Sequence, residues 1–318
     1  MAAKRILVTG ATGFVGGLLA RRLIEDGYAV RCLVRDGESE PARLLAAAGC
    51  ELVRADLSAD DGLDEAMAGI EAAYFLVHML DAGEEYGDAE RAGAGRFARA
   101  ATAADVSRVI YLGGLGDETA SEHLIARHAT ALVLEELGPP LTYFRAAMII
   151  GPGSESFELL RGICERLPAM PVTDWLETKT QPIGAEDVVD YLREALDVEA
   201  SIDREIQLGG PQVVTHLELV KEMAAALGRR PPLRIRMSPE IARPATVAAG
   251  AGAVTEGTPE IAAQISLGLT TPSVVTDPSG MALFSIRPKA LDAVLAEAVD
   301  TPDEALLAPC AARSASRS

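Results

Sequence analysis

Near its start the chain passes from a short apolar run through a glycine-rich turn into an amphipathic helix, and this order constrains the fold more than any other feature. Residues 5–9 (RILVT) are mostly apolar and lead directly into residues 9–16 (TGATGFVG). Residues 14–26 then carry leucine and isoleucine at helical spacing on one side and charged residues on the other, and Gly27 ends the pattern. A buried strand, a tight turn and a helix in this order are typical of the first unit of an α/β sheet.

The same rhythm of strand and helix continues along the next part of the chain. We expect further strands at 29–34, 51–54, 73–77, 108–112 and 141–146, and helices near 40–48, 61–68, 88–104 and 119–137. Strands that alternate with helices predict a parallel sheet with helices on both faces, and right-handed crossovers make this a doubly wound Rossmann fold.

The glycine spacing of the first turn indicates what this fold binds. Gly10 permits the tight turn, Gly13 lets the backbone approach a pyrophosphate, and Gly16 lets the helix pack closely on the strand. The free amides at the helix start then hold the phosphates, with Thr12, Phe14 and Val15 as further contacts. The alternative is a turn with a purely structural role.

The end of the second strand predicts which dinucleotide is bound. NAD-binding proteins place an acidic residue there to bind the adenosine ribose, but this chain has Val34 at that position, followed by Arg35. Asp36 comes later than such an acid usually would. Because Arg forms a forked contact to phosphate, the sequence predicts NADP(H); the alternative is a solvated loop arginine.

After about residue 147 the pattern changes to turn-rich segments with short helices near 155–166, 186–197 and 215–227 and a brief return to the sheet near 204–208. We therefore expect an NADP-binding Rossmann domain over 1–150. We expect residues 151–305 to form a mixed region that completes the sheet and builds a smaller, mostly helical substrate lobe, and 306–318 to form a flexible tail.

The glycine spacing resembles the extended and atypical short-chain dehydrogenases/reductases, including NmrA-like and isoflavone-reductase-like proteins. This resemblance implies further cofactor contacts after the third, fourth and fifth strands. They are Asp56 and Leu57 beside the adenine, Leu76, Val77 and His78 beside the ribose and nicotinamide, and Gly113 and Gly114.

The residues that usually carry the chemistry of this superfamily are replaced here. The fifth strand ends YLGGLG, with no Ser at the usual place, and the next helix has no Tyr-x-x-x-Lys. At the matching distance stand His123 and Arg127, one helical turn apart. An imidazole can exchange a proton near neutral pH, and an arginine can hold the nicotinamide ribose and keep positive charge beside the histidine. The alternative is a pair of helix-surface residues with no role.

The chain is similar to an atypical subgroup in which His-x-x-x-Arg replaces Tyr-x-x-x-Lys. The stretches YFLVHML, YLGGLG, RAAMIIGPGSESFELLR and TQPIGAEDVV carry this similarity, which covers most of residues 4–300. It implies fold and cofactor better than substrate.

Several further residues are candidates with open alternatives. His78, Met148 and Trp175 are candidates for the substrate site, and Arg145, at the end of the sixth strand, for lining it. For His78 and Trp175 the alternative is a cap or core residue. We expect His216 to lie on the surface and Asp187 to cap a helix.

Composition excludes some functions. A formal net charge of −18 over 318 residues repels nucleic acid and anionic lipid. The N-terminus runs straight into a strand and no apolar run is long enough to span a membrane, so we expect a cytoplasmic protein without a signal peptide. The four cysteines have no metal-site spacing and are expected to be reduced, mostly buried thiols.

These observations predict an NADPH-dependent reductase of a hydrophobic carbonyl compound, such as an aromatic or polyketide-like ketone of secondary metabolism, with His123 as proton donor. The missing Ser and Tyr keep an alternative open, a redox sensor that binds NADP without turnover as NmrA-like proteins do. A third possibility is an enzyme whose net reaction is non-redox. The expected partner is the small-molecule substrate, not nucleic acid or membrane, and a homodimer is left open.

Overall fold

A parallel sheet of seven strands forms the centre of the computed structural model, which describes residues 3–59, 61–77, 86–117, 122–172, 174–236 and 271–301. The strand order is β11-β6-β5-β4-β1-β2-β3, and each neighbouring pair is parallel. The strands are β1 (Arg5–Val8), β2 (Ala29–Val34), β3 (Glu51–Arg54), β4 (Ala72–Phe75), β5 (Arg108–Gly114), β6 (Leu141–Ala146) and β11 (Arg204–Leu208). The predicted return to the sheet near 204–208 is confirmed as the edge strand β11.

Helices cover both faces of this sheet. One face packs against α1 (Phe14–Glu25), α2 (Glu40–Ala47) and α7 (Ala185–Glu194), and the other against α3 (Leu63–Met67), α4 (Tyr86–Ala103) and α5 (Glu122–Leu137). Alternate strand residues separate the two cores: Ile6 and Val8 face α1, whereas Leu7 faces α4. The doubly wound Rossmann fold expected from the sequence is confirmed.

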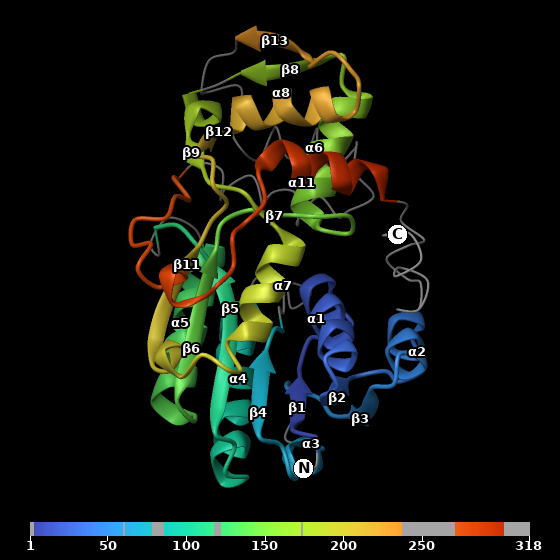
Figure 1. Ribbon diagram of the computed structural model, residues 1–318, viewed down its shortest axis with the longest axis vertical. Helices are drawn as coiled ribbons and strands as arrows, with labels where there is room; N and C mark the ends of the chain where they lie inside the picture. The colour runs from blue at the N-terminus through green and yellow to red at the C-terminus, as the bar shows by residue number, and fades with distance from the viewer. Residues whose placement is uncertain are drawn as a thin grey trace.

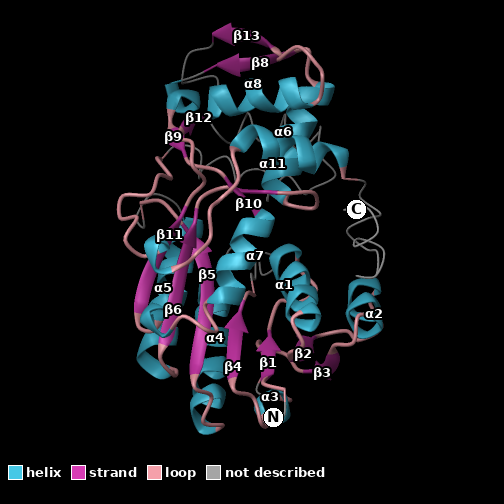
Figure 2. Ribbon diagram, viewed as in Figure 1, coloured by secondary structure: helices cyan, strands magenta, loops and turns pink. Residues whose placement is uncertain are grey.

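A smaller lobe lies beyond the carboxyl ends of the strands (Figure 1). It contains α6 (Glu155–Arg166), α8 (His216–Ala226) and α11 (Leu291–Asp300), whose apolar faces meet in a third core around Phe157, Met223 and Leu295. The short strands are β7 (Ile149–Ile150), β8 (Ala169–Val172), β9 (Lys179–Thr180), β10 (Ile183–Gly184), β12 (Val214–Thr215) and β13 (Leu233–Arg236), and the 3₁₀ helices are η2 (Asp174–Glu177), η3 (Glu199–Ser201) and η4 (Met281–Leu283). Figure 2 shows the large sheet pointing toward this lobe.

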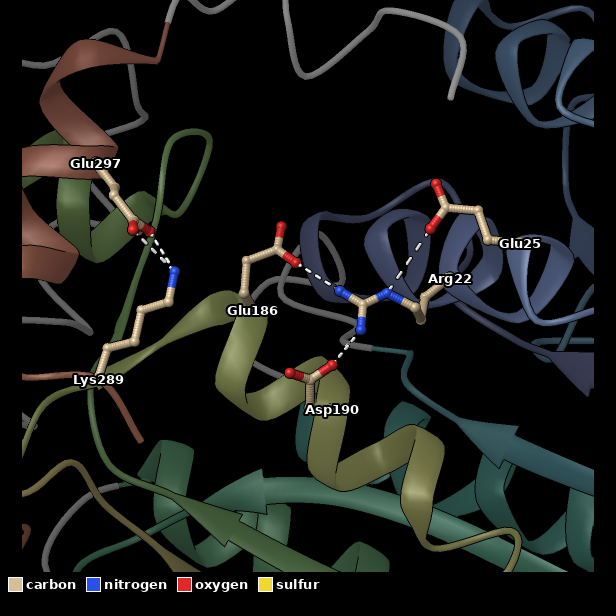
Figure 3. A network of polar contacts seen from close by, with 6 residues as sticks. All are labelled: Arg22, Glu25, Glu186, Asp190, Lys289 and Glu297. Atoms are coloured by element: carbon tan, nitrogen blue, oxygen red, sulfur yellow. Dashed lines mark hydrogen bonds and ion pairs between the residues drawn. The ribbon is translucent and has the colours of Figure 1, made fainter. Parts of the chain in front are cut away.

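Charged contacts join α1, which follows the glycine-rich turn, to α7 from the second half of the chain. Arg22 on α1 forms ion pairs with Glu186, at 3.0 Å, and with Asp190, both on α7, and lies near Glu25 of its own helix (Figure 3). At the left of the same view, Lys289, which precedes α11, pairs with Glu297 of α11 (Figure 3). The contact between α1 and α7 thus connects the glycine-rich turn to the chain segment that leads into the small lobe.

Asp187 does not cap α7, contrary to the expectation. The residue before α7 is Gly184, and no side chain of the described residues caps that helix. The Asp187 carboxylate is buried in the first turn of α7 and accepts a hydrogen bond from the Lys289 amide at 3.0 Å. It therefore ties the chain before α11 to α7, and burial raises the pKa of this carboxyl.

Candidate functional site

The glycine-rich turn after β1 is so tightly packed that two of its glycines admit no side chain. Gly10 has a φ of +66°, and a Cβ there would lie 2.4 Å from the carbonyl oxygen of Leu76 at the end of β4. A Cβ on Gly16 would lie 2.2 Å from the Gly10 oxygen. Gly10 thus permits the close approach of β1 and β4, and Gly16 permits the close approach of α1 to the turn.

Gly13 occupies a different environment at the start of α1. Its amide donates to the Gly10 oxygen at 3.0 Å, and a Cβ would meet only that oxygen, at 3.2 Å. Thr12 and Gly13 are exposed, whereas Phe14 and Val15 are half-buried. The first amides of a helix have no partner within it, so this exposed start of α1 offers donors to an anion.

Two side chains expected at the adenosine end lie close together. Arg35 is exposed, directly after the buried Val34. The carboxylate of Asp56 accepts hydrogen bonds from the amide and the hydroxyl of Ser58, both at 2.8 Å. These bonds, and the nearby Arg35, lower the pKa of Asp56. The structure therefore places a cation and an anion side by side after β2 and β3.

Leu57 is oriented away from this edge. Its side chain is buried in the core beneath the sheet, and its carbonyl oxygen accepts a hydrogen bond from Arg96 Nε at 2.9 Å. Leu76 and Val77 are half-buried after β4 and pack against opposite cores. His78 lies outside the described residues.

The glycines that end β5 make room for two neighbours. A Cβ on Gly113 would lie 2.8 Å from the ring of Tyr143, and one on Gly114 would lie 2.9 Å from Leu124. Leu124 belongs to the first turn of α5, so the start of α5 rests on the loop after β5. His123, half-buried, occupies the adjacent position in this turn.

Arg127 turns inward, toward the ends of two strands. Its Nη2 donates to the carbonyl oxygen of Leu112 at 2.9 Å, and its Nη1 donates to that of Val77 at 3.4 Å. Nη1 also lies 3.7 Å from the carboxylate of Glu90, and the Arg127 side chain is 13% exposed. The structure thus brings His123 and Arg127 to one turn of α5 and directs the guanidinium into the protein.

Arg145 supports the loop after β5 from the other side. It is buried, and it donates to the carbonyl oxygens of Gly114 at 3.3 Å and Gly116 at 2.6 Å while its Nη1 pairs with Glu205. Its described contacts thus connect the loop that α5 covers to Glu205 of β11.

Two candidates for the substrate site, Met148 and Trp175, and the expected surface residue His216 belong to the small lobe. Met148 is half-buried, packs against the third core, and accepts a hydrogen bond from the Ile183 amide at 3.0 Å. Trp175 lies in η2, and its side chain is outside the described part of the chain. The expectation that His216 lies on the surface is wrong: it is 6% exposed, and burial lowers its pKa to about 4.

Glu90 is a buried residue of this site that was not predicted. It is fully buried on α4, in line with the buried Ala94, Phe97, Ala98 and Ala101. The signal was present in the sequence, since a carboxylate four residues before Ala94 falls on the apolar stripe of the helix.

Other kinds of site find no support among the described residues. Within them, His, Cys, Asp and Glu side chains form no group suited to a metal ion, and the helices include none with the length and apolar character to cross a membrane. Cys32, Cys50 and Cys164 are buried free thiols. Cys310 and the expected tail lie outside the described residues.

A doubly wound sheet with a glycine-rich turn into α1, and a small lobe beyond the strand ends, defines a Rossmann-type protein of the dehydrogenase/reductase class. The model of the NmrA-like family matches residues 2–234. The chain therefore belongs to the NmrA-like family, as its sequence motifs indicated.

Curated relatives include several reductases. The (4-alkanoyl-5-oxo-2,5-dihydrofuran-3-yl)methyl phosphate reductase of Streptomyces griseus is 28% identical over 72% of this chain and 75% of its own length. The ceramide reductase of Caulobacter vibrioides is 29% identical over 52% of this chain and 53% of its own, and the photosystem II assembly factor of Cyanophora paradoxa is 28% identical over 59% and 57%. The chain thus spans little more than half the length of the latter two relatives.

Solved structures share the fold over nearly the whole chain. Triphenylmethane reductase of Citrobacter sp. complexed with NADP(H) has a TM-score of 0.72 at 23% identity, covering 92% of this chain and 99% of that one. The NADPH-dependent quinone oxidoreductase of Escherichia coli, complexed with NADPH, has a TM-score of 0.75 at 17% identity, covering 93% and 100%. A nucleoside-diphosphate-sugar epimerase from Pseudomonas aeruginosa has a TM-score of 0.71 at 20% identity, covering 94% and 97%.

Proposed function

We propose that this protein is an NADPH-dependent reductase of a conjugated carbonyl compound, with His123 as the proton donor. The observation that carries the proposal is the placement of His123 on the first turn of α5, beside the loop after β5. In an open α/β sheet, ligands lie outside the carboxyl ends of the strands. The loop after β5 and the glycine-rich turn after β1 both lie at these ends.

The residues at this edge fit a dinucleotide. The start of α1 is exposed at Gly13 and has room for a pyrophosphate, and the turn before it closes only because Gly10 and Gly16 lack side chains. Arg35 offers an exposed guanidinium to a 2′-phosphate. NADPH, when bound, supplies the hydride; the chain supplies binding, orientation and a proton.

His123 would deliver its proton to the oxygen of the substrate. A positioned donor lowers the barrier because negative charge on that oxygen is neutralised as it develops. The relatives and neighbours named for a conjugated lactone, a quinone and a triphenylmethane dye support a conjugated hydride acceptor. Conjugation delocalises the charge that hydride addition leaves behind, so an imidazole donor suffices without Tyr-x-x-x-Lys. The apolar core of the small lobe supports a hydrophobic substrate.

Steady-state kinetics with NADPH and a panel of quinones and conjugated ketones test this assignment. His123→Ala should lower turnover by about 10²–10⁴-fold, the range for a positioned proton donor, with little change in NADPH affinity. His128→Ala, a substitution of a half-buried histidine elsewhere on α5, is the control and should retain activity. A His123→Ala protein as fast as its parent would remove His123 from the mechanism.

A second candidate is an NADP-binding redox sensor without turnover. The inward orientation of Arg127 favours it, because this guanidinium contacts backbone carbonyls and Glu90. Tight NADPH binding together with no turnover on any compound of the panel would favour the sensor. The neighbour named as an epimerase supports the third alternative, an enzyme with a net non-redox reaction.

A further inference from the structure

Glu90 places a carboxylate inside the protein, directly behind the candidate site. It is 0% exposed, on the face of α4 whose other members are alanine and phenylalanine. A buried carboxylate is costly unless a cation and hydrogen bonds compensate it. Thr130 Oγ1 donates to Glu90 at 3.2 Å, and Arg127 Nη1 lies 3.7 Å away, both from α5.

The same guanidinium holds the two strand ends that bound the site. Arg127 donates to the carbonyl oxygen of Leu112 in β5 and to that of Val77 just after β4. It lies over the ring of Tyr111, 5.5 Å from the ring centroid, and the Tyr111 hydroxyl donates to the Arg127 carbonyl oxygen. A planar fork can reach two carbonyls and a carboxylate at once, whereas the single ammonium of lysine cannot span them in this way.

We propose that Glu90 is a positioning residue for the candidate site, and that it acts by holding Arg127 across the ends of β4 and β5. The inference rests on the proposed function, because these ends form part of the edge where the dinucleotide is expected to lie. Glu90 is too deeply buried to contact a ligand, so its effect passes through Arg127. The pair therefore gives Arg127 a role in the shape of the site.

A double-mutant cycle with Glu90→Gln and Arg127→Met tests this coupling through calorimetric titration with NADPH. Glu90→Gln keeps the shape of the side chain and removes its charge. Each single variant should bind NADPH about 5- to 30-fold more weakly, and the double variant should bind no more weakly than Arg127→Met alone, because both substitutions break one interaction. Arg127→Lys should not restore affinity. Losses that multiply in the double variant, or an unchanged affinity in Glu90→Gln, would overturn the inference.

A matched control separates positioning from general stability. Arg31 is also buried and also binds backbone carbonyls, those of Glu65, Ala66 and Ala68, near the opposite edge of the sheet. Arg31→Met should lower the melting temperature while NADPH affinity stays that of the parent. An equal loss of affinity in Arg31→Met would show that Glu90 acts only through stability and would overturn the inference.

Should Glu90→Gln not fold, Thr130→Val removes only one contact to Glu90 and should weaken NADPH binding in the same direction by a smaller factor; unchanged affinity there would overturn the inference. A parent protein that binds no NADPH would overturn the proposed function and this inference together. If the parent binds NADPH and the Glu90→Gln variant binds it equally well, the inference about Glu90 is overturned while the proposed function stands.

Discussion

Arg35 is a cation with an anion beside it. Asp56 keeps its charge because Ser58 donates to it twice, and Arg35 lies close enough to lower the pKa of Asp56 further. This carboxylate attracts the Arg35 guanidinium toward the loop after β3. A 2′-phosphate carries more charge than one carboxylate and presents three acceptor oxygens, so it competes well for the fork of Arg35.

The first prediction concerns this choice of cofactor. NADPH should bind about 10- to 100-fold more tightly than NADH, because the ribose acid of NAD-binding proteins is replaced by Val34 and the cation Arg35 follows. Arg35→Ala should remove most of this difference, measured by calorimetric titration with both nucleotides. Arg96→Ala is the control, since Arg96 also lies near Asp56 but donates to the Leu57 carbonyl oxygen. Equal affinities for the two nucleotides in the parent would contradict the assignment.

Among the elements, the strand–turn–helix unit at the start of the chain follows most directly from the sequence. Gly10 and Gly16 of the turn each meet a steric or conformational demand that other residues cannot satisfy. Such demands act over a few residues and leave a readable pattern. The strands β7, β10 and β12 have two residues each, too few for a period, and form only because distant segments meet.

Side-chain orientation was harder to predict than element position. The spacing of His123 and Arg127 places them on one side of α5, but whether Arg127 faces solvent or the core depends on Glu90 of another helix. Likewise, His216 lies within the capping box formed by Thr215 and Glu218, which marks where α8 begins. That local signal contains no information on what packs against the helix start, so the burial of His216 could not be inferred from it.

The second prediction tests the turn as an element. Gly13→Val should abolish NADPH binding while circular dichroism stays near normal, because a side chain there would occupy the space in front of the α1 amides. Gly27→Ala, after the other end of α1, is the control: its φ of +82° makes alanine unfavourable by about 1–2 kcal/mol, but it should leave NADPH affinity unchanged. Unchanged affinity in Gly13→Val would place the cofactor elsewhere.

At the scale of the whole molecule, net charge and the burial of a histidine change the stability of the folded state in opposite directions as the pH falls. The net charge is −18 at pH 7 and the isoelectric point is about 4.7, so acidification toward that point relieves repulsion among carboxylates and favours the folded state. His216 opposes this trend. It is 6% exposed at the start of α8, and its buried Nε2 has no hydrogen-bond partner among the residues that the structure describes.

The last prediction isolates that opposing contribution. The folded-state pKa of His216 is about 4, below its ordinary value of 6.5. Well above pH 6.5 the imidazole is neutral in both states. As the pH falls below 6.5, the unfolded chain takes up a proton that the folded protein excludes, so the free energy of unfolding decreases until the pH reaches about 4. The full loss is about 3 kcal/mol. His216→Met removes this titration while keeping an apolar side chain in the space. Urea unfolding of parent and variant is measured at several pH values between 7.5 and 4.5. The variant should gain stability relative to the parent as the pH falls. The difference between their free energies of unfolding cancels the carboxylate effects, because these are common to both proteins. A difference that stays constant across this range would mean that His216 titrates as freely in the folded protein as in the unfolded chain.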